Sequence, residues 1–317
     1  MSEQHVVDAA PPAGGGPAPR RILRDETLLV LALSLGASGV SALISFIGAL
    51  TRPAALKQQA ATLNGSYAPG RPWLDLAWQL FGIATALVPV ALVAHLLLRE
   101  GGWARMLPGS LSRGGAEAGS AVGSGAGAGA GAGAWAAVGT AGSAAGSAPG
   151  ARGLRVLGFD RTRPWPDLGR GALVAAGIGS AGLVFYLVAR ASGFNLTVVP
   201  ESLPDVWWKY PVLILSAIQN SVLEEVIVVG YLLRRLDQLG WSARSSLAAS
   251  AVLRGSYHLY QGIGGFIGNM VMGVVFVWLY RRWGRVGPLV VAHALLDIVA
   301  FVGYGLLAGK VGWLPTV

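Results

Sequence analysis

Six ionisable residues lie inside apolar stretches of the sequence, where a charged side chain is costly. They comprise three carboxylates, two histidines and one arginine, namely Glu224, Glu225, Arg254, His258, His293 and Asp297. A charged residue at the centre of a membrane-spanning helix costs about 2.5–3.5 kcal/mol on insertion scales. Because such residues usually mark functional sites, we treat these six as a candidate catalytic site.

The spacing of these residues indicates which side chains can meet. His293 and Asp297 are four residues apart, which places both on one face of a helix. Arg254 and His258 repeat that spacing. We therefore expect two helices that each present a pair of polar side chains to a shared site.

The two glutamates are neighbours, and their side chains diverge by about 100° around a helix axis. One glutamate should therefore face the site while the other supports it. We expect Glu225 to pair with Arg254 or with backbone groups. Glu224 lies ten residues before Arg234, so it is predicted about 15 Å below the cytoplasmic membrane boundary.

The composition is that of a membrane protein. Of the 317 residues, 53% are hydrophobic and only 12% are charged, and the mean hydropathy is +0.56. Soluble domains usually carry about 25% charged residues. The net charge of +9 does not indicate nucleic acid, because the basic residues cluster at the ends of apolar runs. The absence of cysteine excludes disulfides, thiolate zinc sites and a cysteine nucleophile.

The sequence predicts an all-α, polytopic transmembrane bundle of about seven spans in the cell membrane. A span needs about 20 apolar residues, and the candidate runs cover about 27–50, 73–98, 171–190, 210–234, 245–260, 265–280 and 287–308. Residues 261–269, between the fifth and sixth spans, should form a tight turn or a partly re-entrant segment. With the N-terminus cytoplasmic, most of the 24 lysines and arginines fall on the inner side.

Composition divides the chain into four segments. Residues 1–19 are rich in Pro, Gly and Ala and are predicted to be a disordered tail. Residues 20–100 hold two N-terminal spans. Residues 101–156 contain "GSGAGAGAGAGA" and are predicted to be a flexible linker. Residues 157–317 carry the candidate site.

Three motifs resemble a known family when they are taken in order. They are "EE" at 224–225, "LRGSYHLYQG" at 253–262 and "HALLD" at 293–297. Their order resembles that of the CPBP family of intramembrane endopeptidases, which includes the CAAX prenyl proteases and Abi-like, bacteriocin-processing relatives. The resemblance covers about 205–308, and the family patterns are EExxxR, FxxxH and HxxxN/D. Two positions depart, since Val229 replaces the motif arginine and Arg254 replaces the motif phenylalanine.

The resemblance implies hydrolysis of a peptide bond in a membrane-associated protein or peptide. Glu224 would activate a water together with His258, His293 would donate to the oxyanion, and Asp297 would orient His293. This interpretation needs no cofactor. Zn²⁺ is compatible with the same residues, because two imidazoles and two carboxylates form an acceptable ligand set, here Glu224, His258, His293 and Asp297.

Other functions would use the same apolar spans. A non-catalytic immunity or chaperone-like membrane factor could keep the fold without the chemistry, and the missing motif arginine favours that alternative. An ion-coupled transporter is less well supported, because the sequence shows no clear inverted repeat or matching pair of broken helices. The six residues could also form a purely structural ion cluster. Such a cluster would stabilise helix packing poorly, since the cost of desolvating the charges can exceed the Coulomb gain between them.

The two motif departures predict a compensation, in which an arginine lost at position 229 is replaced by Arg254. Arg254→Phe combined with Val229→Arg should therefore retain more activity than Arg254→Phe alone, because the double variant restores a positive charge near the glutamates. Peptide-cleavage rates of the two variants test this. Equal rates would show that the two positions do not compensate each other.

Overall fold

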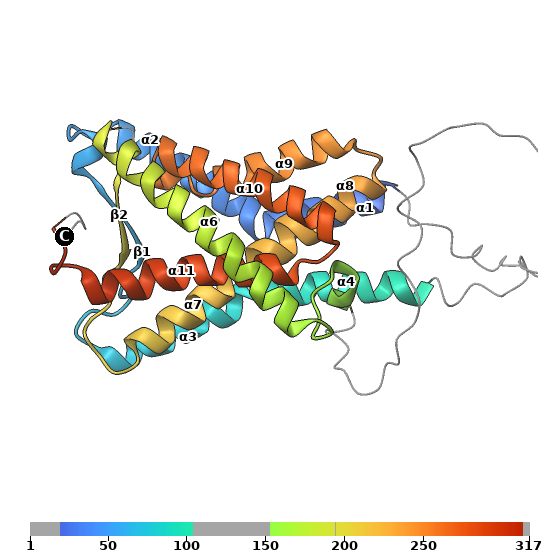
Figure 1. Cartoon of the computed structure of the whole chain (residues 1–317), viewed down its shortest axis with the longest axis horizontal. Helices are drawn as coiled ribbons and strands as arrows, with labels where there is room; N and C mark the ends of the chain where they lie inside the picture. The colour runs from blue at the N-terminus through green and yellow to red at the C-terminus, as the bar shows by residue number, and fades with distance from the viewer. Residues whose placement is uncertain (1–19, 104–152, 194, 313–317) are drawn as a thin grey trace, which may run out of the picture.

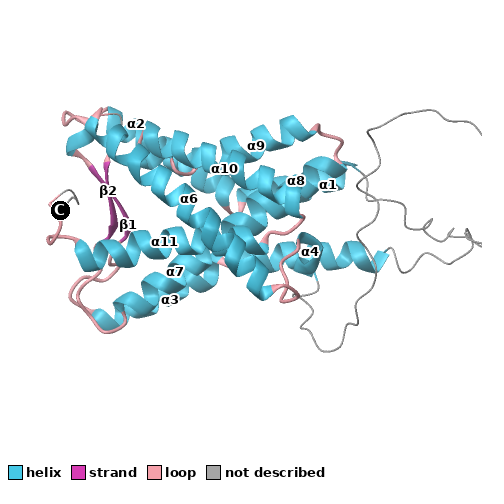
Figure 2. Cartoon of the chain, in the orientation of Figure 1, coloured by secondary structure: helices cyan, strands magenta, loops and turns pink. Residues whose placement is uncertain are grey.

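The computed structural model describes residues 20–103, 153–193 and 195–312. Within these ranges the chain is a bundle of α-helices with one short sheet (Figures 1 and 2). The predicted all-α membrane bundle is therefore confirmed. The predicted tail at 1–19 and most of the predicted linker at 101–156 lie outside the described residues, and the division into four segments stays a prediction.

Five helical segments are long and apolar enough to cross a membrane. They are α3 and α4 together (Pro72–Ala86 and Val88–Trp103), α6 (Pro164–Ala191), the continuous unit of α7, η3 and α8 (Lys209–Gln238), α10 (Ile263–Trp283) and α11 (Gly287–Leu307). A sixth results if α1 (Arg20–Ala32) and α2 (Leu35–Leu50), which meet at a bend of 49°, count as one span. The described residues thus hold five or six candidate spans, where about seven were predicted.

The predicted fifth span, at about 245–260, is not a membrane-spanning helix in the structure. The helix there, α9 (Ala243–Ser256), has 14 residues and is about 21 Å long, too short to cross alone. A 3₁₀ turn, η4 (Leu259–Gln261), follows it before α10 begins. A turn does join α9 to α10, but it ends at Gly262, whose φ of +108° favours glycine. Residues 263–269, which were predicted to belong to the turn or to a re-entrant segment, instead form the start of α10.

The only sheet among the described residues has two parallel strands, β1 (Ala60–Asn64) and β2 (Thr197–Glu201). It joins the segment after α2 to the segment after α6 at one end of the bundle (Figure 2), which we call the strand end. Gln261 reaches the same region, because its carbonyl accepts from the Leu196 amide at 3.1 Å. Thus α9 and η4 together still carry the chain across most of the bundle.

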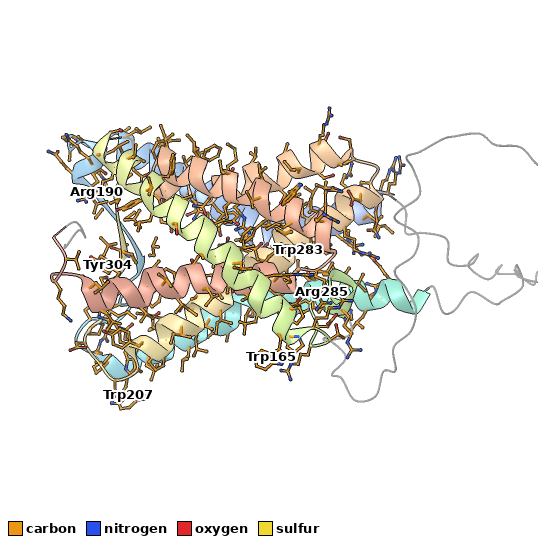
Figure 3. All side chains as sticks on the ribbon, in the orientation of Figure 1. Trp165, Arg190, Trp207, Trp283, Arg285 and Tyr304 are labelled. Atoms are coloured by element: carbon orange, nitrogen blue, oxygen red, sulfur yellow. The ribbon has the colours of Figure 1, made fainter. Side chains whose placement is uncertain are left out.

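We call the opposite end the arginine end, because it carries Arg234, Arg235, Arg281, Arg282 and Arg285. Figure 3 shows Trp165, Trp283 and Arg285 toward this end and Arg190, Trp207 and Tyr304 toward the strand end. Exposed tryptophans lie at both ends, with Trp165 75% and Trp207 73% exposed. Such aromatic residues are typical of the two interfaces of a membrane. The cytoplasmic placement of the arginine end stays a prediction.

Ion pairs dock the N-terminal helices onto α8 (Leu232–Gln238) at the arginine end. Arg235 is fully buried and pairs with Glu26 of α1 at 3.4 Å and with Glu100 of α4. Arg234 pairs with the same Glu100 at 3.1 Å. The buried guanidinium of Arg235 therefore connects α1, α4 and α8, and the two glutamates neutralise its charge.

The largest apolar core lies between Glu224 and the arginine end. Its fully buried members include Val226 to Val229, which follow Glu224 on the same span, Val93 of α4, Leu157, Val286 just before α11, and Leu289 of α11. Gly230 permits this packing, since a Cβ there would lie 2.8 Å from Leu157 Cδ1. The core therefore closes the bundle on the arginine side of the candidate site.

Arg285 clamps the turn before α6 onto the turn between α10 and α11. Its guanidinium pairs with Asp167 at 2.7 Å and with Asp160 at 3.0 Å. Burial by itself would raise the pKa of Asp160, but hydrogen bonds from Arg285 and Thr162 outweigh it and lower that pKa from 3.8 to about 2. The same ion pairs favour the charged form of Arg285, whose pKa is raised, chiefly by the hydrogen bond with Asp167.

Removing this clamp should destabilise the protein. Arg285→Ala leaves two largely buried carboxylates unpaired, which should cost about 3 kcal/mol of unfolding free energy. Because folding depresses the pKa of Asp160, its contribution is complete above about pH 4 and is lost as the pH falls toward 2. The difference between wild type and variant should therefore shrink below pH 4, as measured by denaturant unfolding in detergent.

Arg282 provides the matched control for this test, because it is exposed and lies three residues before Arg285, near the end of α10. Arg282→Ala should leave the unfolding free energy within about 0.5 kcal/mol of wild type. Equal losses in the two variants would contradict the clamp.

Candidate active site

The six predicted residues come together near the middle of the bundle. Glu224 ends α7 (Lys209–Glu224) and Glu225 begins the π-helical segment η3 (Glu225–Tyr231). Arg254 lies on α9, His258 lies in the turn after α9, and α11 carries the last two, His293 and Asp297. Residues from three separate stretches of sequence thus form one polar cluster inside an apolar bundle.

One oxygen of Glu224, Oε2, is the meeting point of the cluster. It accepts a hydrogen bond from the Tyr257 hydroxyl at 2.8 Å. It also lies 3.7 Å from His258 Nε2, 3.7 Å from Arg254 Nη1 and 4.0 Å from His293 Nε2. Glu224 is 8% exposed and lines the main cavity, so its carboxylate can meet a ligand there.

Glu225 has a different environment, because it is fully buried and does not line the cavity. Its Oε1 accepts from the Arg254 guanidinium and from His293 Nδ1, the latter at 2.7 Å. The pairing of Glu225 with Arg254 expected from the sequence is therefore present. The two adjacent glutamates divide as predicted, one facing the cavity and one bonded to its neighbours.

His293 and Asp297 lie on the same face of α11, as their spacing predicts. Their closest atoms, His293 Nε2 and Asp297 Oδ2, are 3.7 Å apart. Since Nδ1 of His293 donates to Glu225, Nε2 is the nitrogen that faces Glu224 and Asp297. A neutral His293 would offer a lone pair there, whereas the imidazolium would donate a second hydrogen bond.

His258 lies just beyond the end of α9, which corrects the expectation that it shares a helical face with Arg254. The helix ends at Ser256, and His258 begins the turn into η4. Its Nδ1 is 3.3 Å from Gln261 Nε2. Its buried Nε2 has no hydrogen-bond partner among the described residues. The 3.7 Å separation from Glu224 is too long for a direct hydrogen bond and suits a water that contacts both groups.

The π-helical turn η3 was not predicted from the sequence. A π-bulge inserts one residue into a helical turn and occurs often at functional sites. Here it begins at Glu225, directly after the glutamate that faces the cavity. Val229, at the position of the motif arginine, lies within this segment and is fully buried. No residue type marks a π turn in advance, although two adjacent glutamates in an apolar span signal that the helix is unusual.

Two further polar residues of the site were missed. The Tyr257 hydroxyl donates to Glu224 at 2.8 Å, and its ring centroid lies 4.8 Å from that of His258. Asn220 lies one turn before Glu224 on α7, interacts with Asp297 and lines the cavity. The four-residue spacing from Glu224 and the position of Tyr257 next to His258 were the available signals.

The predicted zinc ligand set can be compared with the geometry of the site. Neighbouring ligand atoms of the four residues are 3.7–4.0 Å apart. Tetrahedral zinc with bonds of about 2.0–2.1 Å needs about 3.4 Å between ligand atoms. The unpartnered Nε2 of His258 and the bond from His293 Nδ1 to Glu225 suit a metal site, because ligating histidines usually donate their other N–H to a carboxylate. No three of these four residues, all of which the structure describes, have ligand atoms within 4.8 Å of one another, so they offer suitable donors but would have to move closer together to bind an ion.

Glu225 also has an oxygen within 4.8 Å of ligand atoms of Glu224 and His293. That oxygen is the one that already accepts from Arg254 and His293. Glu225 is therefore better placed to support the site than to ligate an ion.

The fold and the site define a class, a helical membrane protein with a buried carboxylate–imidazole cluster at a cavity. Residues 206–299 match the family model described as Type II CAAX prenyl endopeptidase Rce1-like. This segment contains all six residues of the cluster, and the match supports a similarity to the CPBP family of intramembrane proteases. The family resemblance predicted from the three motifs is confirmed. No curated protein and no solved structure matches the chain.

The match supports an intramembrane peptidase of the CAAX-endopeptidase type as the general class. A lipid bilayer and a peptide or protein substrate follow for that class in general. The several apolar helices agree with a multi-pass membrane protein. The match does not include the helices before residue 206, although α1 and α4 contact α8 within it.

The pair of Arg254 and Glu225 can be tested by a double-mutant cycle. Arg254→Met leaves the buried Glu225 carboxylate unneutralised and should cost about 3–5 kcal/mol of unfolding free energy. Adding Glu225→Gln removes the unpaired charge and should recover at least about 1 kcal/mol. Denaturant unfolding in detergent measures all four corners of the cycle.

Arg244→Met is the matched control, because Arg244 is exposed at the start of the same helix. It should have little effect. Additive losses in the double variant would mean that the two side chains are not coupled.

Proposed function

We propose that this protein is an intramembrane endopeptidase that hydrolyses a peptide bond of a membrane-associated protein or peptide. One observation carries the proposal. Glu224 offers a carboxylate oxygen to the cavity with two imidazole nitrogens within 4.0 Å, whereas its neighbour Glu225 is bonded to Arg254 and His293. This arrangement suits general-base catalysis by Glu224, with Glu225 holding Arg254 and His293 beside it.

The first step is attack by water. A water between Glu224 Oε2 and His258 Nε2 would accept a hydrogen bond from the imidazole N–H and donate one to the carboxylate. Gln261 supports this orientation, since its amide donates to His258 Nδ1 and leaves the proton on Nε2. Glu224 takes a proton from the water as its oxygen bonds to the substrate carbonyl carbon. The carbonyl oxygen then carries a negative charge.

The second step returns that proton. The oxyanion collapses, the C–N bond breaks, and Glu224 passes its proton to the leaving nitrogen, so that one water is consumed for each peptide bond. His293 in its imidazolium form donates from Nε2 to the oxyanion while Nδ1 remains bonded to Glu225. Asp297 orients His293 and favours its charged form. Arg254 offsets the negative charge of the two glutamates throughout.

Zn²⁺ is the alternative to this metal-free sequence. Glu224, His258, His293 and Asp297 would hold the ion, which would polarise the carbonyl and acidify a bound water. The steps above require only side chains of the chain itself, and the experiment below separates the two chemistries.

The decisive assay is cleavage of a quenched library of membrane peptides in proteoliposomes. Glu224→Gln should lower the cleavage rate at least about 100-fold, because it removes the general base while keeping the side chain's shape. Wild-type activity should survive a strong chelator. Loss of activity on chelation, restored by Zn²⁺, would favour the metal enzyme instead.

Asp237→Asn is the matched control, because Asp237 lies on the same membrane span but pairs with Arg281 at the arginine end. Its cleavage rate should equal that of wild type. A folded wild type that cleaves no member of the library would favour a non-catalytic membrane factor. Solute flux in the same proteoliposomes would indicate a transporter.

A further inference from the structure

The main cavity, of about 1290 Å³, extends from the catalytic cluster in one direction only. On α7 its lining runs from Ser216 to Glu224, and on α11 it runs from His293 to Leu307. The chain enters α7 at the strand end, and α11 ends there (Figure 1). On both helices, therefore, the cavity occupies the half between the cluster and the strand end.

The other helices repeat this asymmetry. The lining on α10 runs from Gly264 to Met272, near its start at the strand end, and on α6 it runs from Ala172 to Ala189. In the span formed by α3 and α4, residues 79–86 of α3 contribute to the lining, and no described residue of α4 does. Asn64 of β1 and Val198 of β2 line it as well. Glu224 and His293 thus lie at the inner limit of a cavity that leads to the strand end.

The arginine side of the cluster is closed by the apolar core. Val226 follows Glu224 by two residues and is fully buried, and so are Val229, Phe276 and Leu289. Ala292, which directly precedes His293, is also fully buried. A peptide therefore has no route to Glu224 from this side without displacing packed side chains.

The lining also restricts the chemistry of what can enter. Its charged residues, Glu224 and Asp297, lie at the inner limit, and the described lining includes no Lys or Arg. Seven carboxamides line the cavity, namely Asn64, Gln79, Asn195, Gln219, Asn220, Gln261 and Asn269. Carboxamides can pair with both the N–H and the C=O groups of a peptide backbone. Apart from His258 and His293 at the inner limit, the lining therefore offers an acidic side chain no counter-charge.

We propose that the substrate enters from the strand end as an extended segment without acidic side chains, and that the arginine end is closed to it. The proposal rests on the proposed peptidase function for the identity of the occupant. If the arginine end is cytoplasmic, as the distribution of basic residues predicts, the substrate segment approaches from the outer face of the membrane. The site is then deep below the cytoplasmic boundary, as predicted, but is not reached from it.

Thiol labelling tests the direction of entry, because the chain has no cysteine of its own. Ser216→Cys places a near-isosteric thiol in the cavity wall. Lys57→Cys marks the strand end and Arg244→Cys marks the arginine end, since both residues are exposed. A membrane-impermeant thiol reagent is applied to one face or the other of sealed vesicles that hold the full-length protein in one orientation.

We expect Ser216→Cys to react from the face that labels Lys57→Cys and not from the face that labels Arg244→Cys. Ala292→Cys, on the packed side of the cluster, should react from neither face. Labelling of Ser216→Cys from the Arg244 face, or from neither face, would overturn the proposal. This readout needs no catalysis, so it can succeed or fail independently of the cleavage assay.

Protection from labelling tests the occupant. In Ser216→Cys combined with Glu224→Gln, an uncharged Leu/Ala peptide should slow labelling several-fold at concentrations where the same peptide with two Asp substitutions does not. The inactive background keeps the probe intact if the protein is a peptidase. Equal protection by the two peptides, or protection by neither, would overturn the uncharged-segment part of the proposal.

Discussion

The buried contact between Glu225, Arg254 and His293 is the constraint on which the rest of the site depends. A carboxylate with no exposure to water must be neutralised, and Glu225 achieves this with one guanidinium and one imidazole from two other helices. That requirement fixes the distance of α9 and α11 from the α7–η3 junction. Because Nδ1 of His293 is bonded to Glu225, Nε2 is the nitrogen that faces Glu224 and the cavity.

Glu224 is available for chemistry because Glu225 satisfies these structural needs. The two residues are adjacent in sequence but differ in environment, since neighbouring side chains diverge by about 100° around a helix axis. The π-helical segment begins at Glu225. Glu224 retains a hydrogen bond from Tyr257 and longer contacts with two histidines, which leaves space for a small molecule near its oxygen.

The bundle is asymmetric along its long axis, and this asymmetry has a physical origin. Toward the arginine end, large aliphatic side chains fill the space between helices, and ion pairs of Arg235 and Arg285 hold the helix ends together. Toward the strand end, the lining of α6 and α10 is rich in small residues, such as Gly179, Gly182 and Gly268, so the space between helices is not filled. The candidate catalytic cluster lies at the boundary between the packed half and the hollow half.

The sequence by itself determined the membrane class, the helical bundle, the family and the six residues of the cluster. These followed because a charge in an apolar span is conspicuous, and because helical spacing relates residues four positions apart, as it does for His293 and Asp297. The sequence could not give the length of α9, since its apolar pattern continues past Ser256 into the turn that carries His258. Nor could it give the π turn, the roles of Tyr257 and Asn220, or the direction in which the cavity opens. Only the tertiary structure decided these, because each depends on contacts between helices that are far apart in the chain.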